Sequence, residues 1–195
     1  RAAQTISVRN LESGKEFVES YDELVLSPGA SPIHPSWPGI NLPGIFTLRT
    51  VPDSRDIRSW IEKQKPHKAV VVGGGFIGLE MAENLVHRGI AVTVIDLAQK
   101  FMPPLDIEMA EYASHRLEAH GINLVLGDGV SGFEDRGEGR LAVRTQGGLE
   151  FDADLVVLAI GVRPETQLAE SAGLEIGERG GIRVDCQMRT SDPHI

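Results

Sequence analysis

The hydrophobic pattern in the middle of this chain predicts strands and helices in alternation. Apolar, mostly β-branched runs at 69–72 and 91–95 indicate two strands, and the segment 76–88 between them is expected to be a helix that ends at Gly89. Such a succession forms a βαβ unit, in which the two strands lie parallel and a right-handed crossover joins them. A parallel sheet is therefore expected here.

A second helix and strand follow the βαβ unit. After two consecutive prolines, residues 106–119 place apolar side chains on one helical face, and Gly121 separates this helix from a strand at 122–126. Before the unit, a short amphipathic helix is predicted from Pro52 to about Lys65. The alternation of helices and strands indicates an α/β architecture.

From residue 130 onward the period of the apolar positions falls to two. The segment 130–152 contains two glycine-rich turns and predicts a three-stranded antiparallel meander, and residues 155–160 then form another strand of the sheet. A short helix at 166–172 and a final strand at 182–184 follow. We therefore predict an α/β, Rossmann-like fold: a parallel sheet with helices and a small antiparallel meander.

The first 43 residues are organised differently. Alternating positions predict a hairpin at 5–9 and 15–18, which leads to a buried strand at 23–26. Five prolines fall between residues 27 and 43, so this stretch is expected to be an extended linker and a domain boundary. A second unit would then start near Gly44.

Composition and charge exclude several classes of protein. The chain has 195 residues and a net charge of −9, so it offers no broad basic face for nucleic acid. Its longest nearly unbroken apolar stretch has 11 residues, 69–79, which is too short to cross a membrane. A single cysteine, Cys186, allows no internal disulfide, and the six histidines lack metal-ligand spacing. We expect a cytoplasmic protein without a metal site.

A glycine motif marks the candidate chemistry. Gly73, Gly75 and Gly78 form GxGxxG, and the motif, with Phe76 and Ile77 inside it, follows a β-branched strand and opens a helix. A dinucleotide site requires this context, because the first glycine allows a tight turn, the second admits the pyrophosphate and the third lets helix and strand pack closely. The pyrophosphate would lie at the helix N-terminus. The alternative is that these are ordinary turn and packing glycines.

An acidic residue follows the motif at a suitable distance. Asp96 ends the strand 91–95 and lies 18 residues after Gly78, close to the spacing of the acid that binds the adenosine ribose. Its carboxylate can accept hydrogen bonds from both ribose hydroxyls and would repel a 2′-phosphate, which favours NAD(H) over NADP(H). Lys100 is the nearby cation that would weaken this preference.

Several segments resemble one known family. The run at 71–80, VVGGGFIGLE, is similar to the NAD-binding signature of the FAD-dependent pyridine nucleotide-disulfide oxidoreductases. The segment 21–30 resembles the stretch that leaves the FAD domain in this family, and 159–164 resembles the family's second pyridine-nucleotide glycine motif. Two further segments, 101–106 and 188–193, are most similar to the coenzyme A-disulfide reductase and NADH oxidase branch.

The resemblance implies roles for particular residues. Glu80 would face the nicotinamide end of the cofactor, Phe76 would cover the nicotinamide pocket, and Gly161 would let the cofactor approach the backbone beside Ile160. Taken alone, a helical glutamate is more often solvated and a phenylalanine more often belongs to the core. No catalytic residue is assigned. The candidate site consists of cofactor-binding residues: Gly73, Gly75, Phe76, Ile77, Gly78, Glu80, Asp96, Ile160 and Gly161.

The resemblance also implies a domain organisation. Residues 44–179 would be the NAD(H)-binding domain, 1–43 the end of the first FAD-domain segment with its linker, and 180–195 the start of the return segment to the FAD domain. The family's N-terminal FAD motif and redox cysteine would precede Arg1, and its C-terminal dimerisation domain would follow Ile195. We therefore expect a fragment of a homodimeric parent enzyme.

The activity implied for the parent enzyme is hydride transfer from NADH to FAD, followed by reduction of a disulfide or of oxygen. The chain itself is expected to bind NAD(H) without turnover. Two other functions fit the glycine motif: the NAD domain of a ferredoxin or rubredoxin reductase, and a non-catalytic, nucleotide-sensing Rossmann module.

Overall fold

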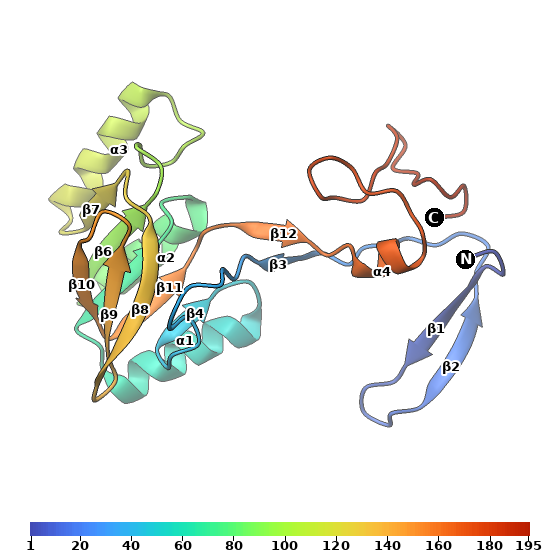
Figure 1. Ribbon diagram of the computed structural model, residues 1–195, viewed down its shortest axis with the longest axis horizontal. Helices are drawn as coiled ribbons and strands as arrows, with labels where there is room; N and C mark the ends of the chain where they lie inside the picture. The colour runs from blue at the N-terminus through green and yellow to red at the C-terminus, as the bar shows by residue number, and fades with distance from the viewer. The chain divides into compact units, whose positions relative to one another are not determined.

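The computed structural model describes residues 1–195, which form two compact units (Figure 1). The larger unit comprises 32–161, and the smaller unit combines 1–31 with 162–195. The predicted α/β fold with a parallel sheet is confirmed, because the larger unit contains a parallel sheet of five strands. In spatial order these strands are β4 (Ile45–Thr47), β11 (Leu155–Leu158), β5 (Lys68–Val72), β6 (Ala91–Asp96) and β7 (Asn123–Leu126).

The central strands of this sheet are covered on both faces. In β5, Val71 points to one side and Val70 to the other, and neither is more than 1% exposed. Successive side chains of a strand point to opposite faces, so an unbroken apolar run needs a covering layer on each side. The larger unit accordingly has three layers.

Helices form one outer layer and the predicted meander forms the other. Leu85 and its neighbours on the helices pack against Val71, whereas Phe133 and Val143 of the meander pack against Val70. The predicted bounds of these elements are confirmed to within about two residues. The elements are α1 (Val51–Gln64), α2 (Phe76–His87), α3 (Ile107–Ala119), β8 (Val130–Gly137), β9 (Arg140–Thr145) and β10 (Glu150–Ala153).

The smaller unit contains a hairpin, a short two-stranded pairing and one short helix. The predicted hairpin is confirmed, with Thr5 opposite Ser20 at its open end. The predicted short helix after the last sheet strand is also present. The elements are β1 (Thr5–Arg9), β2 (Glu16–Ser20), β3 (Ala30–Pro32), which pairs with β12 (Val162–Pro164), and α4 (Gln167–Ser171).

Two predicted strands are wrong. Residues 23–26 and 182–184 form no strand in the structure. The backbone N–H of Leu24 donates to the carbonyl of His194 at 2.8 Å, and the second segment takes part in one isolated bridge. A strand needs a ladder of such bonds to a neighbouring strand. The apolar pattern predicted strands at places where the fold supplies no such neighbour.

The proline-rich stretch is more than an extended linker. Ile40 is buried in the core of the larger unit, and the ring of Trp37 packs on a phenylalanine of β8 with centroids 6.2 Å apart. The larger unit therefore starts at residue 32, before the predicted start near Gly44. The assignment of 1–43 and 180–195 to an FAD-binding domain stays a prediction.

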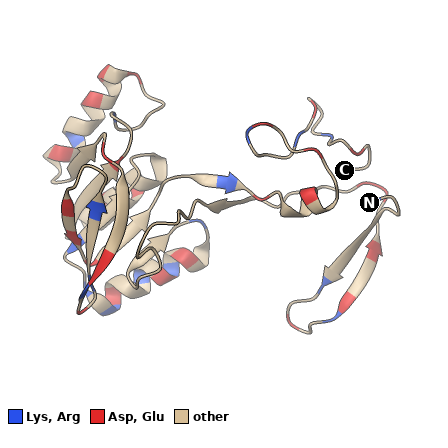
Figure 2. Cartoon of the chain, in the orientation of Figure 1, with Lys and Arg blue, Asp and Glu red and all other residues tan.

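Charges of both signs are interspersed on the outer surface of α1 (Figure 2). Arg58 and Glu62, one helical turn apart, form an ion pair of 2.7 Å between exposed side chains. Such a mixture is typical of a solvated helix face. No helix of the structure has both the length and the apolar character that a membrane crossing requires.

A capping box fixes the start of α1. The hydroxyl of Thr50 accepts a hydrogen bond from the backbone N–H of Asp53. The Asp53 carboxylate accepts from the backbone N–H groups of Thr50, at 2.7 Å, and Arg49, at 2.8 Å. These bonds satisfy amides at the N-terminal end of the helix. They also lower the pKa of Asp53 below its ordinary value, and the bond from Thr50 contributes most.

Replacing Asp53 by alanine should lower the free energy of unfolding by about 1 kcal/mol at neutral pH. The folded-state pKa of this carboxyl is lowered, so its stabilisation is present above the unfolded-state pKa and is lost as the pH falls through the folded-state value. Urea unfolding of both chains at neutral and acidic pH measures the effect. The two stabilities should converge in acid, and a difference that persists there unchanged would contradict the role of the ionised carboxylate.

Candidate dinucleotide-binding site

The parallel sheet contains a point at which the strand order reverses. From β5 the chain continues to β6 and β7 on one side, whereas β11 and β4 lie on the other side. The loops at the carboxyl ends of β5 and β11 therefore diverge and leave a crevice, which is the usual ligand position in open α/β sheets. A cleft of about 480 Å³ lies here, and it is lined by both loops, including Gly73 and Ile160.

The glycine turn after β5 leaves no room for a side chain at two of its glycines. Gly73 has a φ of +107°, and a Cβ built on it would lie 2.4 Å from the carbonyl oxygen of Ala159. A Cβ on Gly78 would lie 1.9 Å from the carbonyl oxygen of Gly73. The first glycine thus allows the tight turn, and the third allows α2 to approach it closely.

Gly75 has the opposite environment. It is the N-cap residue of α2 and lines the cleft, and a Cβ built on it would have no neighbouring atom within 4 Å. No side chain caps this helix N-terminus. The end of the helix therefore offers backbone N–H groups and a partial positive charge next to open space. This arrangement suits a phosphate group that lies against the backbone.

Asp96 is held in the cleft wall by two backbone amides. Its carboxylate accepts hydrogen bonds from the N–H groups of Gly74, at 2.5 Å, and Ala98, at 2.8 Å. The carbonyl of Gly74 accepts from the N–H of Met102 at 3.1 Å, and the buried ring of Phe101 packs against the same glycine. The loop after β6 therefore fastens the glycine turn and places the carboxylate beside it.

The cleft contains a single charged side chain. Asp96 is the only charged residue among those that line it, and the other lining residues are glycines, apolar residues and one glutamine. Lys100, the cation that is nearest in the sequence, donates from its ammonium to the backbone carbonyl of Leu105 and does not line the cleft. An anionic group placed next to Asp96 would therefore meet repulsion without a compensating cation.

The structure brings together some of the predicted site residues and leaves others outside. Gly78 is buried beneath the turn. Phe76 and Ile77, at the start of α2, are 66% and 40% exposed, and neither lines the cleft. Glu80 is exposed on α2 and also lies outside the lining. The predicted residues that line the cleft are Gly73, Gly75, Asp96, Ile160 and Gly161.

Other cleft residues were missed by sequence reasoning. Trp37 belongs to the stretch predicted as a linker, and Gln146 belongs to a turn of the meander, so no motif pointed to either. Leu97 directly follows Asp96 at the carboxyl end of a parallel strand, and this position is a signal that could have found it. The missed residues with side chains or backbone in the lining are Val72, Ile95, Trp37, Leu97, Pro103, Gly129, Val130, Gln146 and Ala159.

Comparison with known proteins decides the family. The model of the pyridine nucleotide-disulphide oxidoreductase family matches residues 1–195. The chain belongs to this family. One relative, an NADH oxidase of Methanocaldococcus jannaschii, is 42% identical over 185 residues, which cover 94% of this chain and 41% of that protein. The chain spans about two fifths of the length of this relative and of other curated relatives that it matches.

Solved structures of family members have the same fold. The crystal structure of reduced Bacillus anthracis CoADR-RHD is 47% identical with a TM-score of 0.94, and the match covers 99% of this chain and 34% of that one. An engineered water-forming NADPH oxidase bound to NADPH, a mutant of LbNOX, is 28% identical with a TM-score of 0.90 over 98% of this chain and 42% of that one. The resemblance predicted from the sequence is confirmed.

Proposed function

We propose that the cleft binds NADH and that this chain is the NADH-binding part of a flavin-dependent oxidoreductase. In that enzyme NADH reduces FAD, and the electrons then pass to a disulfide or to oxygen. One observation carries the proposal: open space over Gly75 and the single charge of Asp96 occur in one crevice, at the ends of two neighbouring parallel strands. The family name and the NADH oxidase relative support the activity.

The pyrophosphate of NADH would lie over Gly75. The first N–H groups of α2 can donate to its oxygens there, and the helix dipole favours its negative charge. The adenosine ribose would then lie against Asp96. Each carboxylate oxygen keeps acceptor capacity after its bond to Gly74 or Ala98, so both ribose hydroxyls can donate to it.

The same carboxylate supports a preference for NADH over NADPH. The engineered NADPH oxidase carries substitutions at a glycine, at an aspartate 18 positions later, at the next two residues and at a proline seven positions after the aspartate. Its aspartate becomes alanine, and two of the other positions become arginine. In this chain Gly78, Asp96 and Pro103 have the same residue types at the same spacing. Removing a carboxylate and adding cations is the change that a 2′-phosphate needs.

The nicotinamide end would extend toward the loop after β11. Gly161 has a φ of +102° and carries no side chain that could block a ring at the backbone beside Ile160. The exposed Phe76 lies at the start of α2, and its role at this end, like that of Glu80, stays a prediction. The chain's residues would hold and orient the dinucleotide, and FAD would supply the hydride acceptor.

The chain alone should bind NADH without turning it over. Hydride transfer requires the nicotinamide within about 3–3.5 Å of its acceptor, and in this proposal the acceptor is FAD held largely outside the larger unit. Residues 1–43 and 180–195 would contribute to that FAD-binding part.

Calorimetric titration with NADH, NADPH and FAD tests the proposal. NADH should bind at least about tenfold more tightly than NADPH, as expected when one charge-assisted contact is replaced by repulsion. FAD should not bind. Reduction of added FAD by NADH at enzymatic rates would contradict the expected lack of turnover.

The variant Gly75→Val tests the pyrophosphate position. The Cβ of the added side chain would point into open space in the cleft, since no atom beyond the adjacent residues lies within 4 Å of it. NADH binding should be lost while the urea unfolding midpoint falls only slightly, because valine is a poorer N-cap residue than glycine. A variant that binds NADH as tightly as the unaltered chain would contradict the proposed position.

A further inference from the structure

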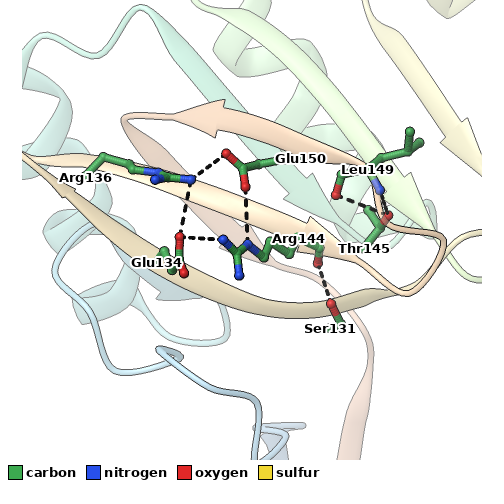
Figure 3. A network of polar contacts seen from close by, with 7 residues as sticks. All are labelled: Ser131, Glu134, Arg136, Arg144, Thr145, Leu149 and Glu150. Carbon is green, nitrogen blue, oxygen red and sulfur yellow. Dashed lines mark hydrogen bonds and ion pairs between the residues drawn. The ribbon is translucent and has the colours of Figure 1, made fainter.

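Ion pairs and hydrogen bonds connect the strands at the base of the turn between β9 and β10. Arg144 and Glu150 face each other across the hairpin and form an ion pair of 3.2 Å. Two residues of β8 extend this pair into a network of four charges (Figure 3). Beyond it, the N–H of Thr145 donates to the carbonyl of Leu149 at 3.0 Å, and the N–H of Leu149 donates to the Thr145 hydroxyl at 3.0 Å. The hairpin therefore presents its tip in a defined position.

The tip of this turn is bonded to the loop after β7. The N–H of Gln146 donates to the carbonyl of Gly129 at 2.7 Å, and the N–H of Gly147 donates to the Asp128 carboxylate at 2.8 Å. The N–H of Asp128 in turn donates to the backbone carbonyl of Asp96 at 3.2 Å. Hydrogen bonds thus connect the turn to the residue that carries the cleft's carboxylate.

The side chain of Gln146 lines the cleft with an unpartnered amide. Its neighbours in the lining include Leu97 and Val130, which provide apolar surface. Its Nε2 lies close over Gly129, because a Cβ built on that glycine would be 2.9 Å from it. The fixed tip of the hairpin therefore presents a primary amide, a donor and an acceptor, to a partly apolar part of the cleft.

We infer that Gln146 is a specificity-determining residue that recognises the adenine base of NADH. The inference rests on the proposed function, which places the pyrophosphate at Gly75 and the ribose at Asp96. The adenine base then lies beyond the ribose, on the side of Asp96 that is away from the glycine turn. Residues on that side of the cleft face the base. A primary amide is complementary to the N6/N7 edge of adenine, since its oxygen accepts from the exocyclic amino group while its nitrogen donates to N7.

This geometry predicts discrimination against hypoxanthine. In reduced nicotinamide hypoxanthine dinucleotide a carbonyl replaces the exocyclic amino group, so an acceptor would face the amide oxygen of Gln146. Rotating the amide by half a turn satisfies that carbonyl but places the amide oxygen against the lone pair of N7, which carries no hydrogen in either base. One of the two hydrogen bonds is lost in either orientation.

Titration of the full chain with NADH and with the hypoxanthine analogue tests the inference. The unaltered chain should bind NADH about tenfold more tightly than the analogue, and Gln146→Ala should bring this ratio close to one. Gln99→Ala is the matched control, because Gln99 is exposed near the same loops but does not line the cleft. This control should keep the ratio of the unaltered chain. Both variants should keep its urea unfolding midpoint, because the turn is bonded through the backbone of Gln146.

The outcomes separate the two proposals. An unaltered ratio in Gln146→Ala, with NADH still bound, would overturn the role of Gln146 and leave the proposed function standing. Equal affinities of the unaltered chain for NADH and the hypoxanthine analogue would also overturn the role of Gln146 and leave the proposed function standing. Failure of the unaltered chain to bind either dinucleotide would overturn the proposed function and the role of Gln146 together.

Discussion

Replacing Gly73 by alanine should abolish NADH binding and lower the free energy of unfolding by about 3 kcal/mol or more. The φ of +107° at this position is one that L-residues rarely adopt, and the new methyl group would lie 2.4 Å from the carbonyl oxygen of Ala159. Gly73 and Ala159 directly follow the neighbouring central strands β5 and β11, so neither can move away without loss of the bond from the Ala159 N–H to the Val72 carbonyl at 2.7 Å.

Urea unfolding and calorimetric titration measure the two effects. Gly75→Ala is the matched control for stability, because its methyl group meets open space and its φ of −84° suits any residue. The control should unfold within about 0.5 kcal/mol of the unaltered chain. If Gly73→Ala is as stable as the unaltered chain, the turn has room for a methyl group and the prediction is contradicted.

Replacing Asp96 by alanine should weaken NADH binding about 10- to 100-fold, which corresponds to the loss of about 1.5–3 kcal/mol from hydrogen bonds to a charged group. NADPH binding should change much less, because the lost hydrogen bond is offset by removal of the repulsion on its 2′-phosphate. The preference for NADH over NADPH would therefore largely disappear. Titration of both dinucleotides into both chains measures the change.

A second variant separates the two tasks of this carboxylate. Asp96→Ala also frees the N–H of Gly74, so part of its effect can arise from a loosened glycine turn. In Asp96→Asn the amide oxygen can still accept from Gly74 while the negative charge is gone. Asp96→Asn should be more stable than Asp96→Ala and should still lose discrimination against NADPH. An unchanged ratio of the two affinities in Asp96→Asn would contradict the charge argument.

The residues predicted from the glycine motif and its spacing lie within one βαβ unit, whereas Ile160 and Gly161 were predicted from the family resemblance. Gly73, Gly75, Gly78 and Asp96 are close in the sequence, and their relative positions follow from strand, turn and helix geometry alone. Their packing could therefore be anticipated before any tertiary contact was known. In the structure Gly73 and Gly78 leave no room for a Cβ atom, whereas Gly75 borders open space in the cleft.

The rest of the site depends on tertiary packing that no local pattern reports. Trp37 reaches the cleft because a proline-rich segment folds back on β8, and Gln146 does so because the meander covers the sheet at that end. The errors in the predicted fold also arise because local patterns do not report which strands pair. Three-residue strands such as β4 are too short for a period to be recognised, and the apolar run at 23–26 has no strand beside it to complete a ladder.

The most direct measurement is a ¹H–¹⁵N NMR titration of the chain with NADH, following each backbone amide. Binding in the cleft should shift the amides of the glycine turn, the start of α2 and the loops after β6 and β11 most strongly, with Gly75 and Asp96 among them. Amides of the β1–β2 hairpin should not move. The largest shifts at another cavity, such as the one between α2 and α3 beside His87 and His120, would contradict the assignment of the NADH site.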